Sequence, residues 1–300
     1  MTRITKALGL LLLMTIGTTA LTAQNSRLSG LRNEVMALFG SQQGDFALAF
    51  RDLQTGDTLY FNPHLSFHAA STMKTPVLME AYRQAEEGRF KLSDSIAIVN
   101  EFTSIADGSK FMLDSADDSE YSLYQRIGQK ATVYDLLYQM IIYSSNLATN
   151  IIIEKVGAAN VMNTMQQLGA RELKVLRGVE DDKAYAKGLN NTVTAFDLCL
   201  LFEQLGKRSF INPEACDAMV KILLDQKFNE VIPAKLPADV KVAHKTGFIT
   251  GVQHDSGIVF LPDGRKYVLV ILSKNLADRS SSIEAMAKVS LAVYQYMQGR

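Results

Sequence analysis

The alternation of apolar and polar residues predicts β-strands near both ends of the chain. Residues 46–53 and 58–61 alternate around the turn at 54–57, so they are expected to form a β-hairpin. Three further strands are expected toward the carboxyl end, at 240–244, 255–261 and 267–273, the last two joined by a Pro-Asp-Gly turn. The early hairpin and the late strands can therefore form one antiparallel sheet.

Apolar residues spaced three or four apart predict helices in the rest of the chain. Terminal helices are expected at 29–38 and 281–297. Between about 93 and 226 the pattern is mostly helical, and Gly follows several of the apolar runs, as at a helix end. The expected internal helices span 76–87, 132–142, 147–156, 161–168, 194–205 and 213–224.

This order of elements predicts an α+β fold in which an antiparallel five-stranded sheet is flanked by terminal helices. An α/β lobe would comprise about 27–70 and 230–300, and an all-helical lobe about 71–229. Ligand sites tend to lie at such interfaces, so the active site is expected between the lobes.

Composition narrows the possible functions. The chain has 300 residues, of which 47% are hydrophobic, enough for one large domain or two interleaved lobes. It carries 31 basic and 31 acidic residues. A nucleic-acid-binding protein would show a basic excess, so this class is excluded, as is bulk attraction to an anionic membrane.

The first 23 residues have the pattern of a secretory signal peptide. Arg3 and Lys6 precede an apolar run at 7–17, and small residues lead to a cleavage site after Ala23, with Ala20 as the rival. An uncleaved amino-terminal anchor is the alternative. With cleavage, a periplasmic or secreted protein without stable membrane association is expected.

The two cysteines, Cys199 and Cys216, both lie in apolar helical patterns. An oxidising compartment permits a disulfide between them. The apolar flanks favour buried thiols instead, because a free cysteine behaves as a small hydrophobic residue.

The sequence Ser71-Thr72-Met73-Lys74 precedes one of the expected helices. A serine hydroxyl is a weak nucleophile until a base takes its proton. A residue three positions later on a helix lies on the same face, so Lys74 could reach Ser71. A serine before a helix is also a common N-cap, so this motif alone is weak.

Two further polar motifs lie at the joints between elements. Tyr143-Ser144-Ser145-Asn146 separates two apolar helices and could present Ser144 and Asn146 to a cleft, or simply cap the turn. Lys245-Thr246-Gly247-Phe248 is expected at a strand end, where Lys245 and Thr246 could bind a carboxylate. Gly247 would let a ligand approach the backbone.

The three motifs together are much more specific than any one. S-x-x-K, S-D-N and K-T-G form the set of class A β-lactamases and penicillin-binding proteins. Here they occur in that order: Ser71 and Ser144 are 73 positions apart, and Ser144 and Lys245 are 101 positions apart. The sequence thus resembles the class A β-lactamase and penicillin-binding serine hydrolase superfamily over essentially the whole mature chain.

This resemblance implies a role for each matching residue. Ser71 would be the acylated nucleophile, Lys74 its base or proton relay, and Ser144 the proton donor to the leaving nitrogen. The remaining roles would be those of Asn146, which holds Lys74 and the substrate amide; Lys245 and Thr246, which bind the substrate carboxylate; and the backbone N–H groups of Ser71 and Phe248, which form the oxyanion hole. No metal and no cofactor are implied.

Two positions depart from the class A pattern. Glu180 lies where the deacylation base of that class is expected, after Arg177, but the fourth residue beyond it is Ala184 instead of Asn. Glu180 could equally belong to a solvated acidic face with Asp181 and Asp182. The middle residue of the second motif is Ser145 instead of Asp.

Other clusters of reactive residues have simpler explanations. His64 and His68 are four apart but lack a third zinc ligand. His254-Asp255-Ser256 cannot converge as a catalytic triad because the residues are adjacent, so Asp255 is expected to support the K-T-G strand. The acidic stretch 114–120 is expected to be a solvated loop.

Three functional hypotheses follow. The first is a monomeric β-lactamase that hydrolyses an acyl-enzyme on Ser71 with Glu180 as base. The second is a D,D-peptidase or esterase acting on peptidoglycan peptides or small esters, with slow β-lactam turnover. The third is a sensor that is acylated once and stays acylated.

Overall fold

The central five-stranded sheet confirms the predicted fold class. The computed structural model describes residues 26–299, so the predicted signal peptide at 1–23 lies outside the described residues. All neighbouring strands are antiparallel, in the order β2-β1-β11-β10-β9. The strands are β1 (Asp45–Asp52), β2 (Thr58–Phe61), β9 (Lys241–Ile249), β10 (Val252–Phe260) and β11 (Lys266–Lys274).

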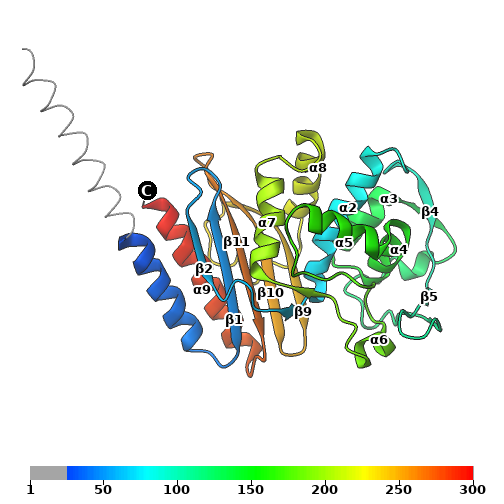
Figure 1. The fold of residues 1–300 in the computed structure, drawn as a ribbon, viewed down its shortest axis with the longest axis horizontal. Helices are drawn as coiled ribbons and strands as arrows, with labels where there is room; N and C mark the ends of the chain where they lie inside the picture. Colours follow the sequence, from blue (N-terminus) through cyan, green and yellow to red (C-terminus); the bar gives the residue numbers. More distant parts are fainter. Residues whose placement is uncertain (1–25, 300) are drawn as a thin grey trace, which may run out of the picture.

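Both faces of the sheet are buried, because successive side chains of a strand point to opposite faces. Phe46, Leu48 and Phe50 of β1 pack with the two terminal helices, one over residues 26–40 and the other α9 (Arg279–Gln298). Ala47 and Ala49 face the opposite core, which continues into the helical part of the molecule. Figure 1 shows the terminal helices side by side on the outer face and α7 on the inner face.

The helical part begins with the short 3-10 helix η1 (Ala70–Met73). Polar caps define several later starts: Thr132, Ser145, Thr194 and Asn212 each accept a hydrogen bond from a backbone N–H of the first turn. The helices are α2 (Lys74–Glu86), α3 (Val133–Ile142), α4 (Asn146–Val156), α5 (Ala158–Gln167), α6 (Asp182–Ala186), α7 (Ala195–Gly206) and α8 (Pro213–Leu224). The exact lobe boundaries stay a prediction. Helix α7 lies within the range expected for the helical lobe, yet it packs directly on β1, β10 and β11 of the sheet.

The expectation of mostly helical structure from residue 93 onward is wrong for the stretch before α3. Short strand pairs and loops, with only the 3-10 turn η2 (Tyr124–Arg126), occupy it because its apolar residues are interrupted by acidic and small residues. The pairs are β4 (Ser95–Ala97) with β7 (Lys130–Thr132), and β5 (Phe102–Thr103) with β6 (Lys110–Phe111). A third pair joins β3 (Phe67–His68) to β8 (Thr192–Val193).

Strands β9 and β10 are longer than the sequence pattern predicts. The K-T-G motif lies inside β9 and not at its end, because Lys245, Thr246 and Gly247 keep their pairing with β10 and the turn comes only after Ile249. The added parts of β9 and β10 contain polar residues, so a prediction based on apolar runs did not include them.

The two cysteines are free and buried, Cys199 in α7 and Cys216 in α8. The structure therefore favours the buried-thiol alternative over the disulfide. Across residues 26–299, none of the helices combines the length and apolar character that crossing a membrane requires.

Candidate active site

Ser71 lies in the 3-10 turn η1, which runs directly into α2. Ala70, just before it, has a left-handed backbone with φ of 44°. Such a conformation is costly for a residue with a side chain and persists only where the surrounding structure enforces it. Ser71 is half-buried and lines a cleft between this turn and β9.

Strand β9 lies against this turn at Gly247. A Cβ at Gly247 would lie 3.2 Å from the backbone nitrogens of Ser71 and Thr72. The missing side chain therefore makes room for the backbone around Ser71, whereas the sequence analysis assigned that space to a ligand. The close approach holds the nucleophile turn and the K-T-G strand in one fixed arrangement.

Lys74 is fully buried and faces the α3–α4 turn. Its Nζ donates to the Ser144 backbone oxygen at 2.6 Å, to Asn146 Oδ1 at 2.9 Å and to Ser144 Oγ at 3.2 Å. Burial lowers the pKa of Lys74 to about 7, against the opposing effect of the Asp118 and Glu180 carboxylates. Near neutral pH this amine can therefore both accept and release a proton.

Among the described residues, the hydrogen bonds of the Lys74 amine reach the α3–α4 turn and not Ser71. Proton transfer from Ser71 to Lys74 therefore stays a prediction. The two side chains come from adjacent turns of one continuous helical segment, η1 and α2.

Ser144 connects two buried lysines. Its Oγ accepts hydrogen bonds from Lys74 Nζ at 3.2 Å and from Lys245 Nζ at 3.0 Å. With its lone pairs engaged by two amines, the hydroxyl can direct its own proton into the cleft that it lines. Ser144 also has a left-handed backbone, with φ of 59°, which turns the chain between α3 and α4.

Lys245 is fully buried within β9. Burial lowers the pKa of Lys245 well below its usual value, the neighbouring Lys74 lowers it further, and Asp255 opposes both. Lys245 also donates to the Thr246 backbone oxygen at 2.9 Å. Thr246 remains at the wall of the cleft beside Ser71.

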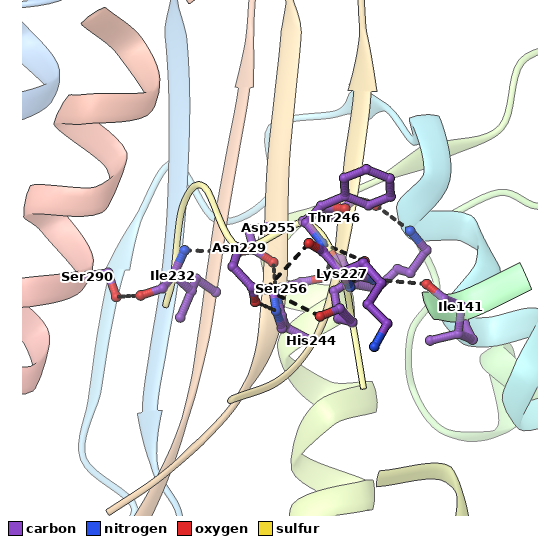
Figure 2. Close-up of polar contacts among 12 residues, drawn as sticks. Ile141, Lys227, Asn229, Ile232, His244, Thr246, Asp255, Ser256 and Ser290 are labelled. Carbon is purple, nitrogen blue, oxygen red and sulfur yellow. Dashed lines mark hydrogen bonds and ion pairs between the residues drawn. The ribbon is translucent and has the colours of Figure 1, made fainter. Parts of the chain in front are cut away.

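A buried polar network joins β9, β10 and the loop before β9 (Figure 2). Asp255 on β10 bonds His244 Nδ1 at 2.8 Å and accepts from the Ile232 N–H at 2.9 Å. The other ring nitrogen of His244 bonds Asn229 Oδ1 at 3.1 Å. This confirms Asp255 as a structural partner behind the K-T-G strand, and it ties the 225–240 loop to the sheet.

Glu180 points into the site and is not part of a solvated acidic face. Its Oε1 accepts a hydrogen bond from Asn146 Nδ2, and it lines the same cleft as Ser71. Burial raises the pKa of Glu180 to about 7, a shift that the Asn146 hydrogen bond partly offsets. Asp118 and Asp117 raise this pKa further, and Lys74 lowers it.

One face of α4 positions Glu180. Asn146 and Asn150 are four residues apart and so lie on the same face of the helix. Asn150 holds Val179 in both directions: its Oδ1 accepts from the Val179 N–H at 2.7 Å, and its Nδ2 donates to the Val179 oxygen at 3.0 Å. Glu180 follows with a left-handed φ of 57°. A helix therefore fixes the backbone beside the carboxylate.

The loop around Glu180 departs from the class A pattern at Ala184 and keeps it at Arg177. Ala184 is buried in α6, where it cannot supply the amide that an asparagine would. The Arg177 guanidinium donates to the backbone oxygens of Gly178 and Leu189 and to Asn190 Oδ1. It closes the loop that carries Glu180.

Asp118 belongs to the site, although the acidic stretch 114–120 was expected to be a solvated loop. Its Oδ2 accepts from the backbone N–H groups of Asn146 and Leu147 at 2.9 and 3.0 Å. Glu120 is buried and accepts from the Leu123 N–H at 2.9 Å. The prediction is therefore wrong for these two residues, because sequence spacing does not show which distant groups a loop carboxylate reaches.

The two histidines considered as a zinc pair, His64 and His68, each bond a different partner. His64 Nδ1 bonds Glu172, whereas His68 Nδ1 accepts from the Ala70 N–H at 3.1 Å. Within residues 26–299, His, Cys, Asp and Glu side chains do not gather into a cluster that could hold a metal ion. His254 Nε2 bonds the His68 backbone oxygen at 2.9 Å, which ties β10 to the segment before Ser71.

Comparison with known proteins gives a match over nearly the whole described chain. A family model described as "Beta-lactamase enzyme family" matches residues 30–297. The extended-spectrum beta-lactamase PER-1 of Pseudomonas aeruginosa is 26% identical over 254 residues, which are 80% of this chain and 78% of that protein.

Solved structures agree with this match. The beta-lactamase from Sphaerobacter thermophilus superposes with a TM-score of 0.77 at 26% identity, covering 91% of this chain and 98% of that one. A point mutant of PBP-A, crystallised as an acyl-enzyme complex with penicillin G, superposes with a TM-score of 0.77 at 28% identity, covering 91% and 97%. The fold described above therefore has structural counterparts over nearly the whole described chain.

Proposed function

Because the chain belongs to the beta-lactamase enzyme family, we propose that it opens the β-lactam ring through an acyl-enzyme on Ser71 and then hydrolyses that ester. The coarser function is that of a serine hydrolase acting on β-lactams. The finer proposal is class A chemistry, with Glu180 as the deacylation base. The observation that carries it is the hydrogen-bonded chain from Glu180 through Asn146 to Lys74.

In acylation, Ser71 Oγ attacks the β-lactam carbonyl carbon and its proton passes to Lys74. A base with a pKa near the operating pH suits this step, and the pKa of Lys74 lies at about 7. The ring C–N bond breaks, and Ser144 Oγ gives its proton to the leaving nitrogen and is reprotonated by Lys74. The backbone N–H groups of Ser71 and Phe248 are the proposed oxyanion donors.

In deacylation, water attacks the ester carbonyl and Glu180 takes the proton. The Ser71–acyl bond breaks and Glu180 returns that proton to Ser71 Oγ, so the net reaction adds one water to the β-lactam. Thr246 is proposed to bind the substrate carboxylate, because it lines the cleft with Ser71. Lys245 is proposed to supply positive charge from behind the cleft wall, because its buried amine bonds Ser144 Oγ, which lines the same cleft. A bound carboxylate would also favour the charged form of Lys245.

Ala184 supports a second candidate function. The asparagine expected four residues after Glu180 would help to hold the attacking water, and Ala184 offers no polar atom there. A penicillin-binding peptidase, an esterase or an acylated sensor would show slow or no deacylation. The proposed setting is a periplasmic or secreted monomer that loses its signal peptide on export and acts on small β-lactams or peptidoglycan peptides.

Incubation of the mature protein with a penicillin, followed by intact-mass measurement over time, tests the proposal. A penicilloyl adduct that disappears while the drug is consumed is the expected result. A stable adduct would transfer the assignment to the penicillin-binding alternatives. If no adduct forms and the penicillin is not consumed, or if Ser71→Ala still forms an adduct, the proposed chemistry is wrong.

Replacing Gly247 with alanine is expected to slow acylation. The new Cβ would lie 3.2 Å from two backbone nitrogens of the nucleophile turn and would push that turn away from β9. Small displacements of reacting groups are costly, and we expect a loss of about 10-fold in the acylation rate. The measurement is the rate of adduct formation by intact mass.

Gly40→Ala is the matched control, because a Cβ at Gly40 meets nothing within 4 Å. It should acylate at the wild-type rate. Equal rates for Gly247→Ala and Gly40→Ala would show that the close approach at β9 does not set the position of Ser71.

A further inference from the structure

We propose that Asp118 is the positioning carboxylate for the Ser144–Asn146 turn, in place of the aspartate that the second motif lacks at Ser145. The inference rests on the proposed function, since it concerns the same acylation step. Asp118 comes from the loop before α3, whereas the motif aspartate would come from the turn itself. The charge is thus supplied by a different segment of the chain.

The contacts of Asp118 converge on the start of α4. Its Oδ2 accepts from the Asn146 N–H at 2.9 Å, the Leu147 N–H at 3.0 Å and Ser145 Oγ at 3.4 Å. These backbone groups are among the N–H groups that a helix leaves unpaired at its first turn. A negative charge there is also favoured by the helix dipole.

The position fixed in this way carries the chemistry. Asn146 uses its side chain to bind Lys74 and Glu180, while its backbone is held by Asp118. Ser144, two residues earlier, bridges Lys74 and Lys245. Movement of this turn would displace both contacts of the proposed base at once.

Asp118 is itself held in place. Tyr124 Oη donates to Oδ2 at 3.0 Å, and the Glu120 N–H donates to Oδ1 at 3.1 Å. The carboxylate is therefore ordered from its own loop and from α4. It also acts at a distance: its charge raises the pKa of Lys74 and of Glu180.

Ser145 lies close enough to Asp118 that an aspartate placed at 145 can test whether Asp118 stands in for the motif aspartate. It is the N-cap of α4 and accepts from the Ala148 N–H at 3.2 Å, a position where aspartate is equally favoured. Because Ser145 Oγ contacts Asp118 Oδ2, a carboxylate at 145 would reach the same region as that of Asp118. In the Ser145→Asp variant the two carboxylates would repel each other. In the double variant the carboxylate at 145 would take the place of the one lost at 118.

The experiment is a cycle of four proteins: wild type, Asp118→Asn, Ser145→Asp and the double variant. We expect Asp118→Asn to acylate about 10- to 100-fold more slowly, since misplaced catalytic groups lose about that much. Ser145→Asp should slow acylation in the wild-type background and restore it in Asp118→Asn. The same substitution would therefore slow acylation in one background and speed it in the other. A purely structural role of Asp118 would not produce these opposite effects on the acylation rate.

Asp117→Asn is the matched control. Asp117 is exposed and adjacent to Asp118, so this variant removes the same charge from the same loop without touching the α4 hydrogen bonds. It should acylate at close to the wild-type rate. The melting temperature of each protein shows whether a variant is folded.

The pH profile gives a second readout. The charged groups that act on the pKa of Glu180 are Asp118, Asp117 and Lys74, and those that act on the pKa of Lys74 are Asp118 and Glu180. The amine of Lys245 faces Lys74 across Ser144 Oγ, which both amines bond. Loss of the Asp118 charge should move the pH midpoints of acylation and of deacylation to lower pH, and Ser145→Asp should move them back.

The outcomes separate the inference from the proposed function. Acylation is measured with a penicillin and, in parallel, with a fluorophosphonate that labels active serines. If the wild type is labelled only by the fluorophosphonate, the β-lactamase proposal is contradicted. The four proteins are then compared by their rates of fluorophosphonate labelling. If Asp118→Asn keeps the wild-type rate, or if Ser145→Asp fails to restore a folded Asp118→Asn protein, Asp118 is not the positioning residue.

Discussion

Replacing Glu180 with glutamine is expected to leave a penicilloyl adduct on Ser71 that persists long after the wild-type adduct has gone. Glutamine keeps an oxygen that can accept the Asn146 hydrogen bond but cannot take a proton from water. General-base catalysis contributes about 10²- to 10⁴-fold, so deacylation should slow by at least that range. Acylation should still occur, because Ser71, Lys74 and Ser144 are unchanged.

Intact mass after rapid mixing measures both steps in one experiment. Asp182→Asn is a suitable control, because Asp182 belongs to the same acidic segment and lies at the start of α6. It should turn over as the wild type does. Undiminished turnover in Glu180→Gln would remove this residue from the mechanism.

The same variant should also alter stability with pH. The pKa of Glu180 rises from 4.5 to about 7 in the folded chain. Between these values the folded protein binds more protons than the unfolded one, so stability falls as pH rises through this window. Glu180→Gln lacks this loss. Its melting temperature should exceed that of the wild type at pH 8, and the difference should vanish near pH 4.

The second large effect is expected for Lys74→Met, which should abolish most acylation. Methionine fills similar space but offers no amine to accept the Ser71 proton or to bond Ser144 and Asn146. We expect the rate of adduct formation to fall by about 10³-fold, within the range for a general base. No adduct should then accumulate, unlike in Glu180→Gln.

The pH dependence of acylation links the two residues. The pKa of Lys74 lies at about 7, so the neutral amine increases as pH rises and acylation should rise with it. Glu180 raises this pKa, so Glu180→Gln should move the acylation midpoint to lower pH. Lys221→Met, on the exposed face of α8, is the control and should acylate normally. A wild-type rate in Lys74→Met would place the base elsewhere.

Sequence reasoning located the sheet, the main helices and the three motifs because each has a local signature. Ser71 with Lys74 is a helical spacing, and the Ser144–Asn146 triplet interrupts two apolar helices. Glu180 was located from the class A resemblance, by its place in the chain after Ser144 and Arg177. Its orientation could not be predicted, because it depends on Asn150 in α4, which binds the preceding residue from 29 positions away.

The misses share a physical cause. Asp118 bonds a helix start 28 residues away, and nothing in the acidic stretch around it distinguishes it from its exposed neighbour Asp117. The extension of β9 depends on its pairing with polar residues of β10, which a search for apolar runs passes over. In each case a tertiary partner decides the outcome, and a local pattern contains no information about that partner.

The two buried thiols can serve as internal probes of local unfolding. Burial raises the pKa of Cys199 to about 12 and that of Cys216 above its usual value, and the Cys216 Sγ donates to the Phe210 oxygen. Since only the thiolate reacts quickly, a thiol reagent can modify these groups only after α7 or α8 leaves its place. The labelling rate therefore reports how often the helical part of the molecule opens. A cysteine introduced on the surface would react first, so a single dye could be attached there while the native pair stays silent.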